Sequence, residues 1–307
     1  MLQANVRRAF SGIMLAAAVL GAGADSAQAQ TTLRYKFKAG ETLKYELQQK
    51  SEMKFNLAEK DTGVDINWQI GTAWKVLEVA TEGKARIALK IETLRLILEG
   101  PAPIGKMEYN SKDAREPEGE LGKKLAPILR ALSGSEFTVT MNSRGEMSDV
   151  HVPEKLLEVL KTTEKNVPEL VKMLSPDNLK RMISQLVPVL PRAPVASGQT
   201  WNQTTETKMP FGTMRVVNTL TYDGPADGGK SLHRITMSPT ITLDADPKAE
   251  ITAKVKGGAG KGIVFFDERA GQIVEATLTQ NMQIQMIVDG RTMTQDIKLT
   301  NVLRLKK

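Results

Sequence analysis

The sequence predicts an α+β protein in which a curved antiparallel β-sheet, half-barrel-like in shape, contains a central helical insertion. Apolar and polar residues alternate through 32–98 and again from 200 to the end of the chain. Short turn sequences separate these runs, which is typical of an antiparallel meander with one face in water. Between the two β blocks, apolar residues at helical spacing occupy about 153–187.

The first β block begins with Leu33, Tyr35 and Phe37, which alternate with basic residues up to a turn at 39–41. This pattern predicts a strand pair at the start of the mature chain. The segment 100–119 is rich in proline, glycine and charged residues, and we expect a loop there. The leucines and isoleucines of 121–132 then share one helical face, and Pro127 is expected to kink or restart that helix.

The helical insertion contains three short helices in this prediction. Pro153 begins the first, 167–174 forms the second, and Ser175 caps a third that starts at Pro176. The proline-rich segment 188–194 ends the insertion. The strands expected after it are 200–209, 212–223, 231–243, 249–257, 260–267, 271–289 and 292–305.

The glycine-rich stretch 256–262 (KGGAGKG) superficially resembles a phosphate-binding loop. A phosphate loop requires a serine or threonine after its lysine and a helix that offers amide groups. Here Gly262 follows Lys261, Ile263 comes next, and strands are expected on both sides. We therefore predict a hairpin turn or a β-bulge at this position.

The N-terminus has the three parts of an export signal. Arg7 and Arg8 precede the apolar run 13–24, and the small residues Ala27 and Ala29 define a cleavage site near Ala29/Gln30. Residues 1–29 are therefore expected to be a signal peptide, through either the Sec or the twin-arginine route. The mature protein is expected in the periplasm or outside the cell, without a transmembrane segment, because the apolar run is shorter than the roughly 20 residues that span a bilayer.

The mature chain, 30–307, is expected to form one β-rich domain with the helical insertion. A faint similarity between Gly40 to Thr42 and Gly198 to Thr200 leaves a second arrangement open, with two β units at 30–190 and 195–307. The chain has no cysteine, so thiolate chemistry, disulfides and lipid attachment at cysteine are excluded. Its net charge of +7 is dispersed along the strands, which is not the clustered pattern of a nucleic-acid-binding protein.

No catalytic or metal-binding pattern stands out in the sequence. The two histidines, His151 and His233, have no ligand spacing between them, and both are expected to be structural or surface residues. We therefore expect no enzyme activity, no cofactor and no metal. The remaining candidate is the apolar face of the helical insertion, which is either ordinary core or the lining of a hydrophobic ligand site. The candidate lining residues are Leu156, Leu160, Met173, Leu179, Met182 and Leu186.

Two resemblances follow from these segments. The chain resembles a bacterial family of exported, β-rich proteins of unknown function, through Gly40, Glu41 and Tyr45 near the start and the Gly260, Gly262, Phe266, Asp267, Gly271, Ile273 element near the end. It also resembles, in architecture only, the periplasmic half-barrel carriers of lipids and lipoproteins. That resemblance implies a sheet that shelters a hydrophobic ligand against helices.

Three functions follow as hypotheses. The first is a non-enzymatic envelope protein that binds a lipid or a lipoprotein acyl chain between the helices and the curved sheet. The second is an envelope scaffold with a protein partner and no small ligand, which would use an exposed sheet edge or the basic C-terminal segment. The third is a hydrolase whose carboxylates converge only in three dimensions, with at least one perturbed pKa in a polar cleft.

Overall fold

One antiparallel sheet of twelve strands dominates the described part of the protein, in a computed structural model that describes residues 30–57, 60–102, 104–113, 115–184, 186–209, 211–226, 231–249, 251–288 and 290–306. The predicted signal peptide, 1–29, lies outside these residues. The strands are β1 (Thr42–Leu57), β2 (Lys60–Val79), β3 (Ala85–Glu99), β4 (Lys106–Asn110), β5 (Glu136–Met141), β6 (Met147–His151), β7 (Thr200–Met209), β8 (Gly212–Pro225), β9 (Leu232–Ala245), β10 (Thr252–Asp267), β11 (Gln272–Val288) and β12 (Arg291–Lys306). The helices are α1 (Gly119–Leu132), α2 (Glu154–Thr163), α3 (Pro168–Met173) and α4 (Pro176–Ser184).

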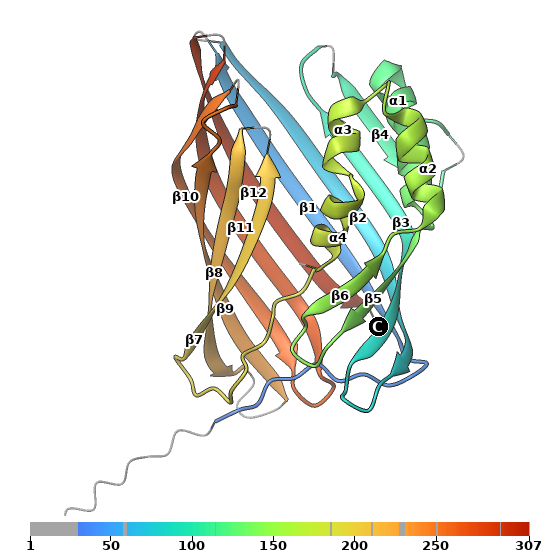
Figure 1. Ribbon diagram of the computed structural model, residues 1–307, viewed down its shortest axis with the longest axis vertical. Helices are drawn as coiled ribbons and strands as arrows, with labels where there is room; N and C mark the ends of the chain where they lie inside the picture. The colour runs from blue at the N-terminus through green and yellow to red at the C-terminus, as the bar shows by residue number, and fades with distance from the viewer. Residues whose placement is uncertain are drawn as a thin grey trace, which may run out of the picture.

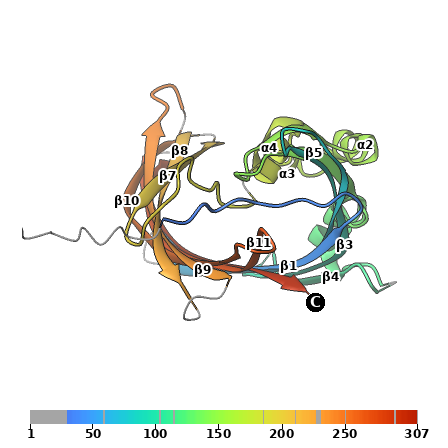
Figure 2. The same ribbon diagram turned by 90° about the horizontal axis from the view of Figure 1, so that it is seen from below.

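The strand order is β6-β5-β3-β2-β1-β12-β11-β10-β9-β8-β7, and β4 pairs with β3 beside that path. The pairing of β1 with β12 joins the two β blocks of the sequence into a single sheet. Seen from below, the sheet curves into an open arc with the helices on its inner side (Figure 2). The predicted α+β class, with a curved antiparallel sheet and a central helical insertion, is confirmed.

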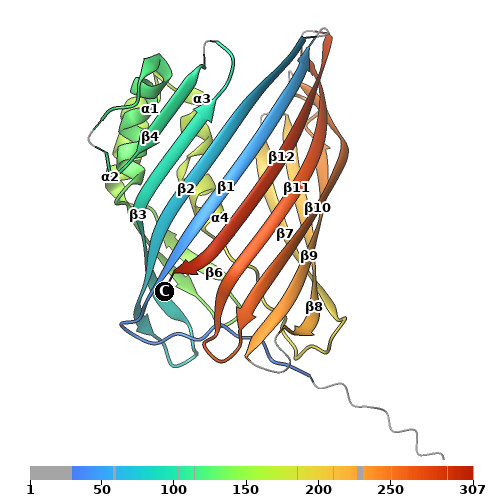
Figure 3. The same ribbon diagram turned by 180° about the vertical axis from the view of Figure 1, so that it is seen from behind.

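Alternation along β1 separates the two faces of the sheet. Tyr45 is buried and Leu43 packs against the core, both on the concave face, whereas Lys44 and Glu46 lie on the convex face. Figure 3 shows that convex face, with β1 and β12 side by side. Its charges form exposed cross-strand ion pairs, such as Lys306–Glu46 at 2.7 Å, and pairs of this kind contribute about 0–1 kcal/mol each.

The helices cover one half of the concave face (Figure 1). Helix α1 packs through Leu129 onto Leu94 and Leu96 of β3, α2 packs against α1, and α4 packs against β6. Pro127 lies inside α1 and neither ends nor restarts it, contrary to one reading of the sequence. It is exposed, so water can satisfy the carbonyl of Lys123 that the missing N–H leaves free.

The segment 31–41 does not form the predicted strand pair. It runs in extended form across the lower end of the arc, and we call it the strap (Figure 2). Its one ladder contact is the bridge between Thr31 and Val195. Leu33 is fully buried and Tyr35 nearly so, which explains the alternation in the sequence. Burial of every second residue is typical of an extended chain with one buried face. Here the buried face packs on the core, and the segment does not pair into a hairpin.

The structure corrects one further expectation and bears out part of another. The segment 100–119, predicted as a loop, contains β4, which extends the sheet beside β3. The glycine-rich stretch, predicted as a hairpin turn or a β-bulge, forms no hairpin turn but lies within β10, and the register shift between Val255 and Gly257 agrees with the β-bulge. A Cβ on Gly260 would lie 2.5 Å from Pro239, and one on Gly262 would lie 2.7 Å from Met237. Glycine is required in β10 because side chains of β9 lie over its backbone.

Candidate functional site

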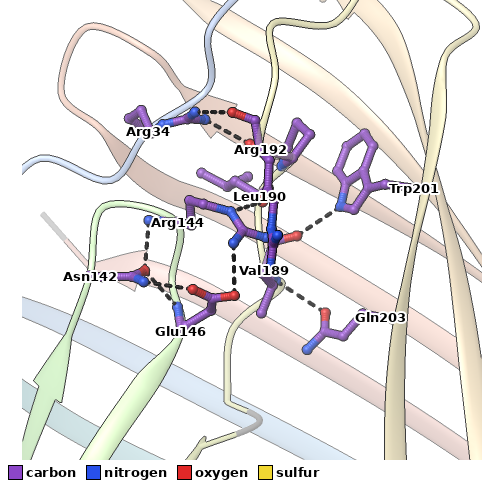
Figure 4. Close-up of polar contacts among 10 residues, drawn as sticks. Arg34, Asn142, Arg144, Glu146, Val189, Leu190, Arg192, Trp201 and Gln203 are labelled. Carbon is purple, nitrogen blue, oxygen red and sulfur yellow. Dashed lines mark hydrogen bonds and ion pairs between the residues drawn. The ribbon is translucent and has the colours of Figure 1, made fainter.

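The two end strands of the strand order, β6 and β7, are bridged by segment 186–195, which connects the helical insertion to β7 (Figure 4). Trp201 of β7 donates its indole N–H to the carbonyl of Val189 at 2.7 Å, and Gln203 Oε1 accepts the N–H of Val189 at 3.1 Å. On the other side, the turn between β5 and β6 holds Leu190: its N–H donates to the carbonyl of Arg144, and Arg144 Nε donates to the carbonyl of Leu190. Side-chain and backbone hydrogen bonds of the bridging segment 186–195 thus close the gap between β6 and β7, which we call the seam.

The strap locks this seam from below. Arg34 donates to the carbonyl of Pro191 at 2.8 Å, and the phenol of Tyr35 donates to the carbonyl of Pro188 at 3.0 Å. The ring of Tyr35 also meets Phe266 of β10 edge to face, with 5.3 Å between ring centroids. The strap, the bridging segment and the sheet therefore share one core.

A groove of about 330 Å³ opens above this seam on the concave face. Its volume is within the range of small-molecule sites. Its walls come from β1, β7, β8, β9, β11, β12 and the bridging segment. The apolar lining residues are Leu47, Leu186, Val187, Pro188, Val216, Met237, Ala276, Leu278 and Leu303. The polar ones are Gln203, Thr205, Asn218, Thr277, Gln280 and Asn301, and no charged residue occurs among the described lining residues.

Four amide side chains form a band across the groove wall, which we call the amide belt: Gln203, Asn218, Gln280 and Asn301. Gln203 of β7 stands opposite Asn218 of β8, and Asn218 stands opposite Pro239 of β9. Below the belt, Leu303 and Met237 belong to the main core. The groove is therefore a site with an apolar floor and uncharged hydrogen-bonding groups above it.

A larger hollow of about 640 Å³ lies on the convex face. Its lining includes Glu52, Lys54, Asp296 and Lys298, whose charges favour water over an apolar guest. The concave groove is smaller and carries the chemistry that suits a hydrophobic ligand.

The six residues predicted to line a ligand site do not lie together in the structure. Leu156, Leu160 and Leu179 are buried in the main core, so the space between α2, α4 and the sheet is packed around them. Met182 is 57% exposed, and the side chain of Met173 lies outside the described residues. Leu186 lines the groove.

Sequence reasoning missed the amide belt. Its signal was present in the strands, where Gln203 and Asn218 occupy positions that alternation assigns to the concave face. Amides at core-facing positions indicate a face that contacts hydrogen-bonding groups as well as apolar side chains, because buried polar groups are normally hydrogen-bonded.

The two histidines lie away from the groove. His151 is exposed at the end of β6. His233 is buried: its Nδ1 lies 2.8 Å from the phenol oxygen of Tyr222, and its Nε2 lies 3.1 Å from Glu268. That phenol also donates to Thr31 at 3.1 Å, so this network fixes the start of the strap.

Among the described carboxylates, every resolved pKa shift is downward. Hydrogen bonds from lysines lower the pKa values of Glu46, Glu52 and Glu82, of which Glu82 is exposed and the other two are partly exposed. The same part of the chain shows no group of three or more potential metal ligands. Nor does any described helix have the length and hydropathy to cross a membrane.

One family model matches residues 82–301, more than two thirds of the sequence. The chain belongs to DUF6263, a family of unknown function. The predicted resemblance to a β-rich family of unknown function is thereby confirmed. The DUF6263 match includes every described groove residue except Leu47 and Leu303, whereas the strap lies outside it.

Comparison with solved structures gives distant similarities. A structure titled for lipid–protein interactions in lipovitellin aligns over 89% of this chain and 26% of that chain, with 14% identity and a TM-score of 0.48. The crystal structure of Pseudomonas aeruginosa OccK5 (OpdH) aligns over 87% of this chain and 99% of that chain, with 8% identity and a TM-score of 0.22. The chain thus spans about a quarter of the lipovitellin chain. No curated protein sequence matches it.

The buried tyrosine of the strap is expected to make the free energy of unfolding depend on pH in the alkaline range. Burial, followed by the proximity of Tyr45, raises the pKa of Tyr35 well above its ordinary value of 10.0, and burial likewise raises the pKa of Tyr45. Above about pH 10 the unfolded chain ionises while the folded chain does not, so the free energy of unfolding falls as pH rises. Tyr35→Phe should reduce that fall by about 1.4 kcal/mol per pH unit. Urea unfolding between pH 8 and 11 measures how the free energy of unfolding changes with pH. Equal slopes in the wild-type protein and in Tyr35→Phe would contradict a raised pKa for Tyr35.

Proposed function

We propose that this DUF6263 member is a non-enzymatic exported protein of the cell envelope that binds a hydrophobic ligand in the concave groove. The observation that supports it is the uncharged groove of about 330 Å³ above the seam, lined by apolar side chains from five strands and the bridging segment. An apolar guest there is shielded from water by walls that already exist. Each buried methylene contributes about 0.8 kcal/mol.

The interface between the helices and the sheet is packed, so the proposed ligand site is the groove and not the space under the helices. Leu156, Leu160 and Leu179 fill the space under α2 and α4, and these residues hold the wall of the half-barrel in place. The ligand lies instead between Leu186 to Pro188 and the opposite strands. Export is supported by the signal pattern of 1–29.

Thr205→Trp tests the site, with Thr204→Trp as its matched control. Thr205 lines the groove on the edge strand β7, and its exposed neighbour Thr204 has the opposite orientation. The indole at 205 should occupy the groove and lower the content of bound lipid at least tenfold, whereas the indole at 204 points to solvent. Native mass spectrometry and solvent extraction of the purified proteins measure the bound material. Equal lipid in both variants, or no lipid in the wild-type protein after reconstitution, would count against the proposal.

The scaffold alternative has one observation in its favour. Strand β7 pairs with β8 only, so one edge of Thr200–Met209 has no ladder partner among the described strands. Exposed edges of this kind add strands from partners. A stable protein complex that survives Thr205→Trp, from a protein that holds no lipid, would favour this alternative.

A further inference from the structure

We infer that the groove selects an uncharged lipid that carries a hydrogen-bond donor, of which diacylglycerol with its free hydroxyl is the simplest example. The inference rests on the proposed function and adds the chemical class of the ligand. It follows from the charge, the polarity and the hydrogen-bonding state of the amide belt.

The first step concerns charge. The described lining contains neither a lysine or arginine to pair with a carboxylate or phosphate, nor an aspartate or glutamate to pair with an amine. A charged headgroup in this groove would lose its hydration without gaining a partner, which is strongly unfavourable. Fatty-acid anions and anionic phospholipids are therefore disfavoured as guests with the head inside the groove.

The second step concerns polarity. The four side chains of the amide belt can each offer both donors and acceptors. Gln203 uses its Oε1 to accept the N–H of Val189, which leaves its NH₂ group as a donor. A saturated hydrocarbon would leave these groups without partners, so the guest must itself contain polar but neutral groups.

The third step identifies a missing donor. Asn218 Oδ1 is shielded from solvent and has no hydrogen-bond partner within the described residues. Its neighbours across the ladder are Gln203 and Pro239, and a proline has no N–H to offer. Buried acceptors of this kind are rare and are normally satisfied by a donor, which in a ligand groove the ligand can supply.

A hydroxyl-bearing neutral lipid satisfies all three conditions. Its hydroxyl donates to Asn218 Oδ1, its ester carbonyls accept from the NH₂ groups of the belt, and its acyl chains lie on the apolar floor beside Leu303 and Met237. A triacylglycerol carries a third acyl ester in place of the hydroxyl, so it has no hydrogen-bond donor.

The test compares lipids that differ in one group, using the delipidated full-length protein in titration calorimetry. The probes are dioctanoylglycerol, trioctanoylglycerol and dioctanoyl phosphatidate, with Asn218→Leu as the variant and the exposed Asn202→Leu as its control. We expect dioctanoylglycerol to bind wild-type protein about tenfold more tightly than either other lipid. Asn218→Leu should remove the preference over trioctanoylglycerol and leave the binding of trioctanoylglycerol intact, whereas Asn202→Leu should behave as wild type.

The outcomes separate this inference from the proposed function. If all three lipids bind equally, and Thr205→Trp removes their binding, the groove is a lipid site and the inference about its selectivity is wrong. A preference for phosphatidate, or a preference for diacylglycerol that Asn218→Leu leaves unchanged, also overturns it. If no lipid binds, the proposed function itself fails.

Discussion

Phe266→Ala is expected to lower the free energy of unfolding by about 4 kcal/mol, the middle of the range for a buried phenylalanine. Phe266 is fully buried in the main core, and its ring meets Tyr35 of the strap. Truncation leaves a cavity where the strap, the sheet and the bridging segment meet, and it removes an edge-to-face contact worth about 0.5–1.5 kcal/mol. Urea unfolding followed by far-UV circular dichroism measures the loss.

Phe265→Ala is the matched control for this substitution. Phe265 precedes Phe266 in β10 and is only partly buried, opposite Arg234 of β9. Its truncation should cost about 1–2 kcal/mol, because less apolar surface is lost to water. Equal losses for the two variants would show that the strap contributes little to the core.

Gly271→Ala is expected to cost about 3 kcal/mol and to release the strap. Gly271 has φ +67°, and a Cβ there would lie 2.4 Å from the backbone nitrogen of Lys36. That nitrogen donates to the carbonyl of Gly271 at 3.0 Å, so the two backbones have no room to separate without losing the bond. The left-handed conformation costs an alanine about 1 kcal/mol, and the steric overlap adds about 1–3 kcal/mol.

Gly83→Ala separates these two contributions. Gly83 has φ +73° in the turn between β2 and β3, and a Cβ there would meet nothing within 4 Å. It should therefore cost only about 1 kcal/mol. Limited trypsin digestion gives a second measurement, because release of the strap frees the backbone at the exposed Lys36 and Lys38 and should speed cleavage there in Gly271→Ala but not in Gly83→Ala. Identical stability and digestion of both variants would contradict a close strap contact.

In the strap, the periodicity of the sequence predicts which residues are buried but not what they pack against. Leu33 and Tyr35 are buried and their basic neighbours are not, as the alternation predicts. Their partners lie far along the chain, at Ser143 and Gly271, which accept the N–H groups of Tyr35 and Lys36. Alternation identifies the buried face of an extended segment but does not identify what covers it.

The candidate site was likewise predictable from the sequence only in part. The apolar helical faces were recognisable, and Leu156 and Leu160 are indeed buried. Whether such residues fill a core or line a cavity depends on how closely the opposite strands approach, which local spacing does not encode. The groove formed instead where Leu186 faces Gln203, Asn218 and Leu303 from three different strands.

The sequence by itself determined the faces of the strands, the helical insertion, the exclusion of cysteine chemistry and the absence of a catalytic motif, because these depend on residue type and on spacing of a few positions. Only the tertiary structure decided that β1 pairs with β12, that the strap and the bridging segment close the seam, and that an amide belt lies over an apolar floor. The first two features join residues more than a hundred positions apart, and the third joins residues of several different strands. Their arrangement follows from the curvature of the whole sheet and from the closing of long loops, which no local pattern specifies.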